Sequence, residues 1–272
     1  MDDRVESCQN STQQPPRSVT NGTVAAGNEH ADRKGPPIDH SNLDFSDQQF
    51  SLERMQQYSV EIKNTWKSSP HDLLNDENIE KIFYFPRFFM YRCYNEELSS
   101  NHIQIIDISW KNFIYPVIKI FKVQTSSNGV ISELPKMNFK RFLESLLEIL
   151  IESFSKIKSS ESSAIQKHLA YKVALIIGDV KKYMMQEDPA IEPEEAEKYF
   201  LSAIIESSSE GIPFNQAGIL FQSTDAIRSL LYFYLATLCP EPFNAAEANA
   251  SHILDCMRER FFGHIKKKSI IK

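Results

Sequence analysis

Beyond residue 45, apolar side chains recur every three or four residues, the spacing that predicts amphipathic helices. The first helix is expected to begin at Ser46, which forms a capping box with Gln49, while Phe45 and Phe50 form a hydrophobic staple around it. Pro70 closes this segment. Its apolar face is expected to comprise Met55, Tyr58, Ile62 and Trp66.

Two further helices are expected over about 76–98 and 102–123, and each contains a proline. Because proline removes a backbone donor and clashes with the preceding turn, each helix should kink, at Pro86 and at Pro116. The stretch 117–123 is rich in β-branched residues, so a β-strand is the alternative for the C-terminal end of the helix expected over 102–123.

The middle of the chain predicts two long apolar helices. The second of them, from Ile165 to Met184, is apolar nearly all round and should therefore lie at the centre of the fold. Pro193, followed by two glutamates, marks the next helix start. The first helix has one apolar face, formed by Phe139, Phe142, Leu143, Leu146, Leu147, Leu150 and Phe154. The remaining helices are expected over about 213–222, 224–238 and 243–265.

The predicted fold is all-α, with about nine antiparallel helices in one domain over residues 46–272. Only 8 of 272 residues are glycine, which disfavours the tight hairpins of a sheet protein. Residues 1–45 are rich in Ser, Thr, Asn, Gln, Gly and Pro, and the first aromatic residue is Phe45. Such a segment buries too little apolar surface to offset its ordering entropy, so we expect a disordered tail.

Composition excludes several function classes. The net charge of −6 disfavours direct nucleic-acid binding, and neither a signal peptide nor a run of eighteen apolar residues is present. The four cysteines include no C-x-x-C pair and the histidines are isolated, so we expect no metal, no disulfide and reduced thiols in the cytosol or nucleus. Nucleotide and hydrolase motifs are also missing. These observations predict a protein that is not an enzyme and needs no cofactor.

A short motif occurs twice, 33 residues apart. Small residues flank an aromatic at helical spacing, the pattern of the second helix in a tetratricopeptide-type hairpin. Gly178 and Gly218 fall in the preceding helices, where a glycine indicates a close helix crossing rather than a turn. Ordinary helix packing is the alternative explanation. The two copies are Ala196-x-x-x-Phe200-x-x-Ala203 and Ser229-x-x-x-Phe233-x-x-Ala236.

Three runs between about 178 and 250 resemble the 14-3-3-like amino-terminal domain of the SMG/Est family, the nonsense-mediated mRNA decay and telomerase-associated proteins. The resemblance is nearest to the SMG-five/SMG-seven branch, and over 46–177 only helix count and apolar spacing agree. The runs are Gly178-Asp179-Val180-Lys181-Lys182-Tyr183, Ala196-x-x-Tyr199-x-x-x-Ala203 and Gly211-Ile212-Pro213-Phe214-Asn215-Gln216-Ala217-Gly218.

The resemblance implies a cytoplasmic adaptor, with shuttling to the nucleus as a further expectation. Its groove would receive a phosphoserine peptide of the decay helicase, and it would form a heterodimer with a related 14-3-3-like subunit. Two alternatives stay open: a telomerase-associated nucleic-acid-binding accessory protein, and a scaffold whose phosphate pocket has decayed. The acidic net charge argues against the former.

The resemblance also implies site residues. Lys182 stands at the family's arginine position, followed by Tyr183, and Asn215 is expected to hold the peptide backbone. Lysine cannot make the bidentate fork that arginine makes with phosphate, so a solvated surface lysine is the alternative. A second base is expected at Arg87, beside the aligned position Phe88. If the reading holds, Lys182→Glu should abolish phosphopeptide binding and leave the fold intact. The fallback bases are Arg92 and Lys81.

Overall fold

The computed structural model describes residues 52–69, 75–128 and 133–270, which belong to one compact unit. The predicted disordered tail, the capping box at Ser46 and the staple formed by Phe45 and Phe50 lie outside the described residues. Pro70 lies outside them too.

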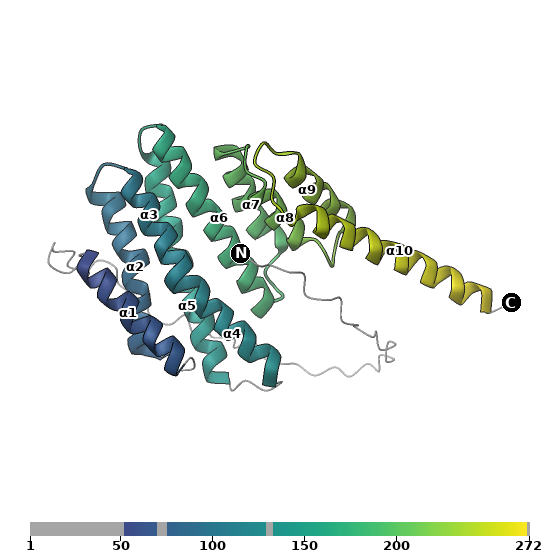
Figure 1. Ribbon diagram of the computed structural model, residues 1–272, viewed down its shortest axis with the longest axis horizontal. Coiled ribbons are helices and arrows are strands. Elements are labelled where there is room, and N and C mark those ends of the chain that lie inside the picture. Colours follow the sequence, from purple (N-terminus) through teal and green to yellow (C-terminus); the bar gives the residue numbers. More distant parts are fainter. Residues whose placement is uncertain (1–51, 70–74, 129–132, 271–272) are drawn as a thin grey trace, which may run out of the picture. The chain divides into compact units, whose positions relative to one another are not determined.

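The described residues form nine helices and no strand beyond a single bridge between Glu210 and Glu241, which confirms the all-α class (Figure 1). The third helix is continuous through three segments, α3, η3 and α4. The bounds are α1 (Leu52–Ser68), α2 (Asp76–Asn95), α3 (Ser100–Ser109), η3 (Trp110–Ile114), α4 (Tyr115–Asn128), α5 (Glu133–Ser159), α6 (Ala164–Glu187), α7 (Pro193–Glu206), α8 (Ile212–Leu220), α9 (Ala226–Leu238) and α10 (Ala246–Ile270).

The two internal prolines are accommodated differently. Pro86 lies inside α2, which continues on both sides of it. Pro116 follows η3, a five-residue π-helical segment. A wider π turn relieves the clash of a proline ring with the preceding turn, so the irregularity expected at Pro116 takes this form. The stretch 117–123 is helical, and the strand alternative for it is wrong because Val117, Ile118 and Phe121 face the core of a helix bundle.

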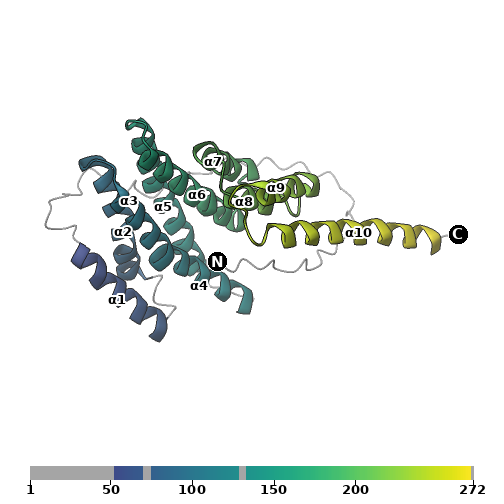
Figure 2. The ribbon, with the colours of Figure 1, turned by 45° about the horizontal axis from the view of Figure 1, so that its top comes forward.

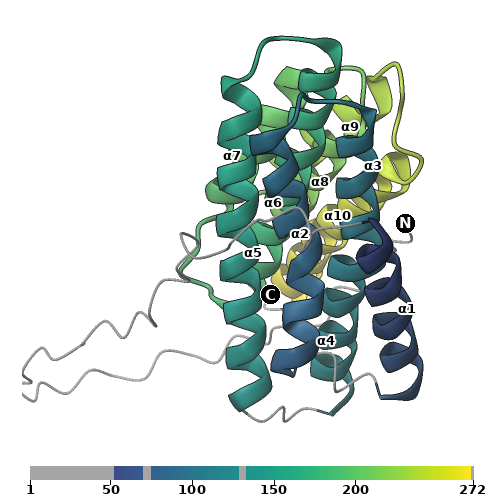
Figure 3. The same cartoon turned by 90° about the vertical axis from the view of Figure 1, so that its left-hand side faces the viewer.

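The largest core lies between α6 and the helices α1 to α5. Aromatic pairs connect the helices: Phe85 of α2 stacks on Phe113 of η3, and Phe121 of α4 stacks on Phe139 of α5. Helix α2 packs on α1, α3 and α5, and Figure 3 shows α1, α2 and α5 alongside one another. Helix α6 packs on α3, α5, α7 and α8, so its predicted central place is confirmed.

Helices α6 to α10 form a second, repetitive region (Figure 2). Each glycine of the sequence pattern lies under the aromatic ring of the following helix. A Cβ atom on Gly178 would come within 3 Å of the Phe200 ring, and one on Gly218 within 2.6 Å of the Phe233 ring. The prediction of close helix crossings is confirmed. It follows that α6 with α7, and α8 with α9, are equivalent hairpins.

Candidate functional site

Lys182 lies in a buried polar cluster between α6 and α8. Only 8% of the residue is exposed, so it is not a solvated surface lysine. Its Nζ atom donates to Asp179 Oδ1 at 2.9 Å and also to the side-chain carbonyl of Gln216. The lysine therefore has an acidic partner in the same helix and a neutral acceptor from the neighbouring helix.

Asn215 continues the cluster from α8 to α10. Its side chain is fully buried, and its Oδ1 atom accepts a hydrogen bond from Asn249 Nδ2 at 2.9 Å. The Nδ2 atom of Asn215 is buried without a hydrogen-bond partner. A buried amide donor with no acceptor costs about 1–3 kcal/mol. This atom is therefore a place where an oxygen acceptor would be bound favourably.

The sequence patterns above did not single out Asn249, although the repeat offset points to it. It stands 33 residues after Gln216, the same offset that relates the two copies of the small-aromatic motif. Both residues are buried and polar in otherwise apolar helix faces. Extending the repeat from α8 to α10 would have found it.

Tyr183 is buried beside two lysines. The Lys182 Nζ atom lies 5.2 Å from the centre of its ring, and the Lys122 Nζ atom of α4 lies 4.5 Å from it. Both distances are within the range of a cation–π interaction. The Tyr183 ring therefore has a second base beside it, Lys122. Sequence analysis missed it because the secondary structure of 117–123 was left open.

Arg87 is held by contacts within α2. On α2, its Nη1 atom donates to Glu80 at 2.6 Å, and its guanidinium lies 5.4 Å from the centre of the Phe83 ring. Arg87 and Lys182 are both cations and hydrogen-bond donors, so no direct contact between them is expected. That the two residues share one site stays a prediction.

The two fallback bases of α2 also have partners within or beside that helix. Arg92 pairs with Glu96, and Lys81 pairs with Glu61 and Glu77. Phe88, the aligned position, is a core residue at 2% exposed. The second helix thus uses its bases to join its own turns and α1.

The cluster can bind an acceptor, but an anion must compete for Lys182. Asp179 already lies at 2.9 Å from the ammonium. A phosphate oxygen would have to displace this contact or the one with Gln216. The Nδ2 atom of Asn215 is a further donor in this region, so the chemistry fits an oxygen-rich ligand group rather than a reaction.

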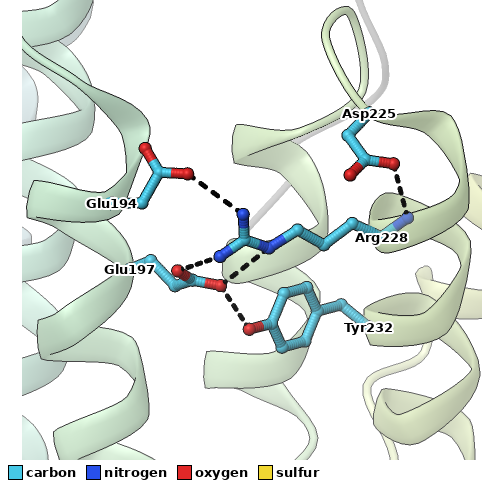
Figure 4. Close-up of polar contacts among 5 residues, drawn as sticks. All are labelled: Glu194, Glu197, Asp225, Arg228 and Tyr232. Carbon is cyan, nitrogen blue, oxygen red and sulfur yellow. Dashed lines mark hydrogen bonds and ion pairs between the residues drawn. The ribbon is translucent and has the colours of Figure 1, made fainter.

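A second polar cluster joins α7 to α9 (Figure 4). Arg228 donates to Glu194 at 3.0 Å and through two nitrogens to Glu197, which is 5% exposed. The hydroxyl of Tyr232 donates to Glu197 as well, and burial together with this hydrogen bond raises the pKa of Tyr232 to about 12. The Arg228 guanidinium also lies over the Phe221 ring at 3.9 Å. Every described group here has a partner, so this cluster is a structural clamp.

The outer face of α9 is apolar and exposed. Four of its residues follow one another at intervals of four, three and four. Ile227 is exposed by 73%, Leu231 by 57%, Tyr234 by 48% and Leu238 by 78%. On α7, Leu201 and Ile205 precede Tyr234 and Leu238 by the repeat offset of 33 and are also exposed. We call these six residues the outer face. Its α9 members are Ile227, Leu231, Tyr234 and Leu238.

Among the described residues, three or more metal-binding side chains never gather at one point. A search of the same residues finds no helix with the length and apolarity needed to cross a membrane.

Comparison with known protein families gives no matching family model, and comparison with curated proteins gives no significant match.

Proposed function

We propose that this protein is a non-enzymatic adaptor that pairs with a related helical subunit through the outer face of α7 and α9. The main observation in support of this proposal is the row of four exposed apolar residues on α9. A surface helix of a monomeric protein normally turns charged or polar side chains toward water. Here α9 is apolar on the buried side and on the opposite side.

The spacing of the row favours a helical partner. Intervals of four, three and four residues are those of the a and d positions of a heptad, which pack against another helix. Fully burying an exposed leucine or isoleucine contributes about 1.5–3 kcal/mol. Four such side chains in one contact contribute a gain of the same order as the cost of association, about 4–15 kcal/mol.

The resemblance to the SMG/Est family supplies the biological setting of the proposal. The adaptor would act in nonsense-mediated mRNA decay, in the cytoplasm with access to the nucleus. Its partner would be a subunit of the SMG-seven type, which shares the 14-3-3-like fold. This setting rests on the resemblance in sequence, to which α6 to α9 add a helical hairpin repeat with two glycine crossings.

Purified protein mixed with a purified SMG-seven-type subunit tests the pairing. Light scattering after size-exclusion chromatography should give a one-to-one complex. Leu231→Glu should remove the complex, because a charge would be buried in an apolar contact. Leu254→Glu on α10 is the matched control, since Leu254 is 45% exposed and lies outside the outer face. A complex that survives Leu231→Glu and Leu238→Glu would contradict the proposed surface.

A second candidate function is recognition of a phosphoserine peptide of the decay helicase at the Lys182 cluster. Two observations favour it: the buried Asn215 Nδ2 atom has no partner, and Lys122 and Lys182 flank one tyrosine ring. A phosphoserine carries about −1.5 to −2 charges and is attracted to such paired bases.

Because Lys182 is buried, Lys182→Glu is not a suitable variant for testing this candidate function. Lys182→Glu would place a second carboxylate beside Asp179 in a buried site, so it would destabilise the fold instead of leaving it intact. Lys182→Met keeps the apolar stem and removes the charge. Fluorescence polarisation with a phosphorylated Ser-rich peptide and its unphosphorylated twin should show selective binding that Lys182→Met removes.

Equal binding of the two peptides would leave the scaffold with a decayed phosphate pocket as the better description. A separate experiment tests the nucleic-acid-binding alternative. Salt-dependent retardation of a single-stranded oligonucleotide in a gel-shift assay would support the telomerase-associated function.

A further inference from the structure

The turn between α7 and α8 carries a serine with an acidic residue three positions later, Ser207 and Glu210. Helix α7 ends at Glu206, and Ser207 has an extended backbone with φ −147° and ψ 95°. Its hydroxyl oxygen lies 3.1 Å from that of Ser209, and the residue between them, Ser208, is exposed. A half-buried serine in a surface turn is within reach of a modifying enzyme.

The same spacing at Ser145 and Glu148 gives no such access. Ser145 lies in the middle of α5, between Leu143 and Leu146, which are fully buried. A kinase binds the residues around its target serine as an extended strand, so it would have to unwind α5 to reach this hydroxyl. The core packing of α5 opposes such unwinding. The fold, and not the spacing alone, therefore distinguishes Ser207.

Backbone hydrogen bonds fix this turn to the chain that follows α9. The Glu241 N–H donates to the Ser209 carbonyl at 2.9 Å, and the Gly211 N–H donates to the Glu241 carbonyl at 2.9 Å. Ile205 of the outer face lies four residues before Ser209, and Leu238 lies three residues before Glu241. Ile205 and Leu238 are exposed by 81% and 78%. The turn therefore borders the carboxyl-terminal edge of the outer face.

The carboxyl end of α7 already has a negative charge. The Glu206 side chain is only 8% exposed and pairs with Lys158 of α5. The last carbonyl groups of the helix add a partial negative charge. A phosphoserine carries about −1.5 to −2 charges, and at a helix C-terminus beside carboxylates such a charge is disruptive. A phosphate on Ser207 would therefore loosen the last turn of α7, which carries Ile205.

We propose that Ser207 is a phosphorylation site for a serine kinase that recognises Glu210, and that the phosphate weakens pairing through the outer face. The effect on pairing rests on the proposed function, whereas the site itself does not. In the reaction, the Ser207 hydroxyl oxygen attacks the γ-phosphorus of ATP. An O–P bond forms while the bond from the γ-phosphorus to the bridging oxygen breaks. ADP leaves, and the hydroxyl proton passes to water through a base of the kinase.

A kinase assay on the full chain tests the site. A purified serine kinase that requires an acidic residue three positions after the serine is added with Mg²⁺ and ATP, and mass spectrometry maps the modified peptides. Phosphate should be found at Ser207 and not at Ser145. Glu210→Gln should slow the modification of Ser207 about tenfold, because it removes the recognised charge.

Glu241→Gln is the matched control for Glu210→Gln. Glu241 forms the bridge with Glu210 but does not lie three positions after a serine. The control should therefore leave the rate of modification of Ser207 unchanged.

Two further measurements follow the effect of the phosphate. Amide hydrogen exchange in the last turn of α7 should become about threefold faster or more, with α5 unchanged. Complex formation with the SMG-seven-type subunit, measured by light scattering, should weaken about tenfold or more. Ser207→Ala, treated with the kinase in the same way, should show neither change.

Three outcomes would overturn the inference: Ser207 is not modified, Glu210→Gln and Glu241→Gln slow its modification equally, or the phosphorylated chain pairs as tightly as Ser207→Ala. A failure of the proposed function is distinguishable, because the untreated chain would then form no complex. In that case the mapped phosphate and the exchange of α7 still decide the inference, and unchanged exchange would overturn it.

Discussion

At the scale of single residues, the two helix glycines have a packing role. Gly178 and Gly218 have no side chain because a phenylalanine ring from the next helix occupies that space. Glycine lowers helix propensity by about 1 kcal/mol relative to alanine, and the close ring contact offsets this cost.

We expect Gly178→Leu to destabilise the protein by roughly 1–3 kcal/mol, because its side chain would displace the Phe200 ring. Urea unfolding at neutral pH measures the change. Ser251→Leu is the control, since this position is exposed on α10 and should change stability by no more than about 0.5 kcal/mol. An unchanged unfolding midpoint for Gly178→Leu would show that the crossing can relax.

Tyr232 gives a pH-dependent prediction. Burial and the hydrogen bond to Glu197 raise its pKa to about 12, above the ordinary value of 10. Between these values the folded chain holds the phenol proton and the unfolded chain loses it, so stability falls as pH rises from 10 to 12. Tyr232→Phe should make the fall shallower.

Urea unfolding at pH 9 and at pH 11 measures this difference. The pKa of the buried Cys93 thiol is also raised to about 12, so both proteins should lose some stability. Parallel pH curves for the two proteins would contradict a role for the Tyr232 proton.

At the scale of elements, α7 and α9 are joined by charge as well as by packing. Glu197 is nearly fully buried and accepts from Arg228 and Tyr232. Removing one partner leaves a buried carboxylate with fewer donors, which costs more than the net contribution of the pair.

A double-mutant cycle tests this clamp. Arg228→Met and Glu197→Gln should each destabilise the fold, and the double variant should be more stable than their sum predicts. We expect a coupling of roughly 1–3 kcal/mol. The exposed Arg258–Asp255 pair within α10 is the comparison, and its coupling should stay under about 1 kcal/mol. If the changes in unfolding free energy of the two single variants simply add in the double variant, packing alone would join α7 to α9.

At the scale of the molecule, stability should be distributed along the helix order. Helix α6 packs on four other helices, whereas the buried apolar residues described on α10, up to Ile253, pack on α9. Regions with few buried apolar contacts open at lower free energy.

Among the helices, amide hydrogen exchange should therefore be slowest in α6 and the facing part of α5, and fastest in α10 beyond Ile253. Mass spectrometry of the exchanged protein measures this order. Equal protection of α6 and α10 in the free protein would contradict this order.

The amino-acid sequence by itself determined the helical class, most helix positions and the glycine crossings. These follow from local causes: apolar spacing sets the buried face of a helix, and an aromatic at a fixed offset explains a glycine in the preceding helix. It also placed Lys182 and Asn215 on two separate helices, and left Lys122 unassigned because 117–123 fitted two kinds of secondary structure.

Only the tertiary structure decided which side chains meet. Lys122 and Asn249 join Lys182 and Asn215 because the hairpins bring α4 and α10 toward α6 and α8, whereas Arg87 remains with Glu80 on α2. The same holds for exposure. Leu254 and Phe221 occupy equivalent positions, and they differ because α8 has a covering helix and α10 has none among the described residues. Spacing along the chain fixes the face of a helix, but the neighbour that covers it is a long-range property of the fold.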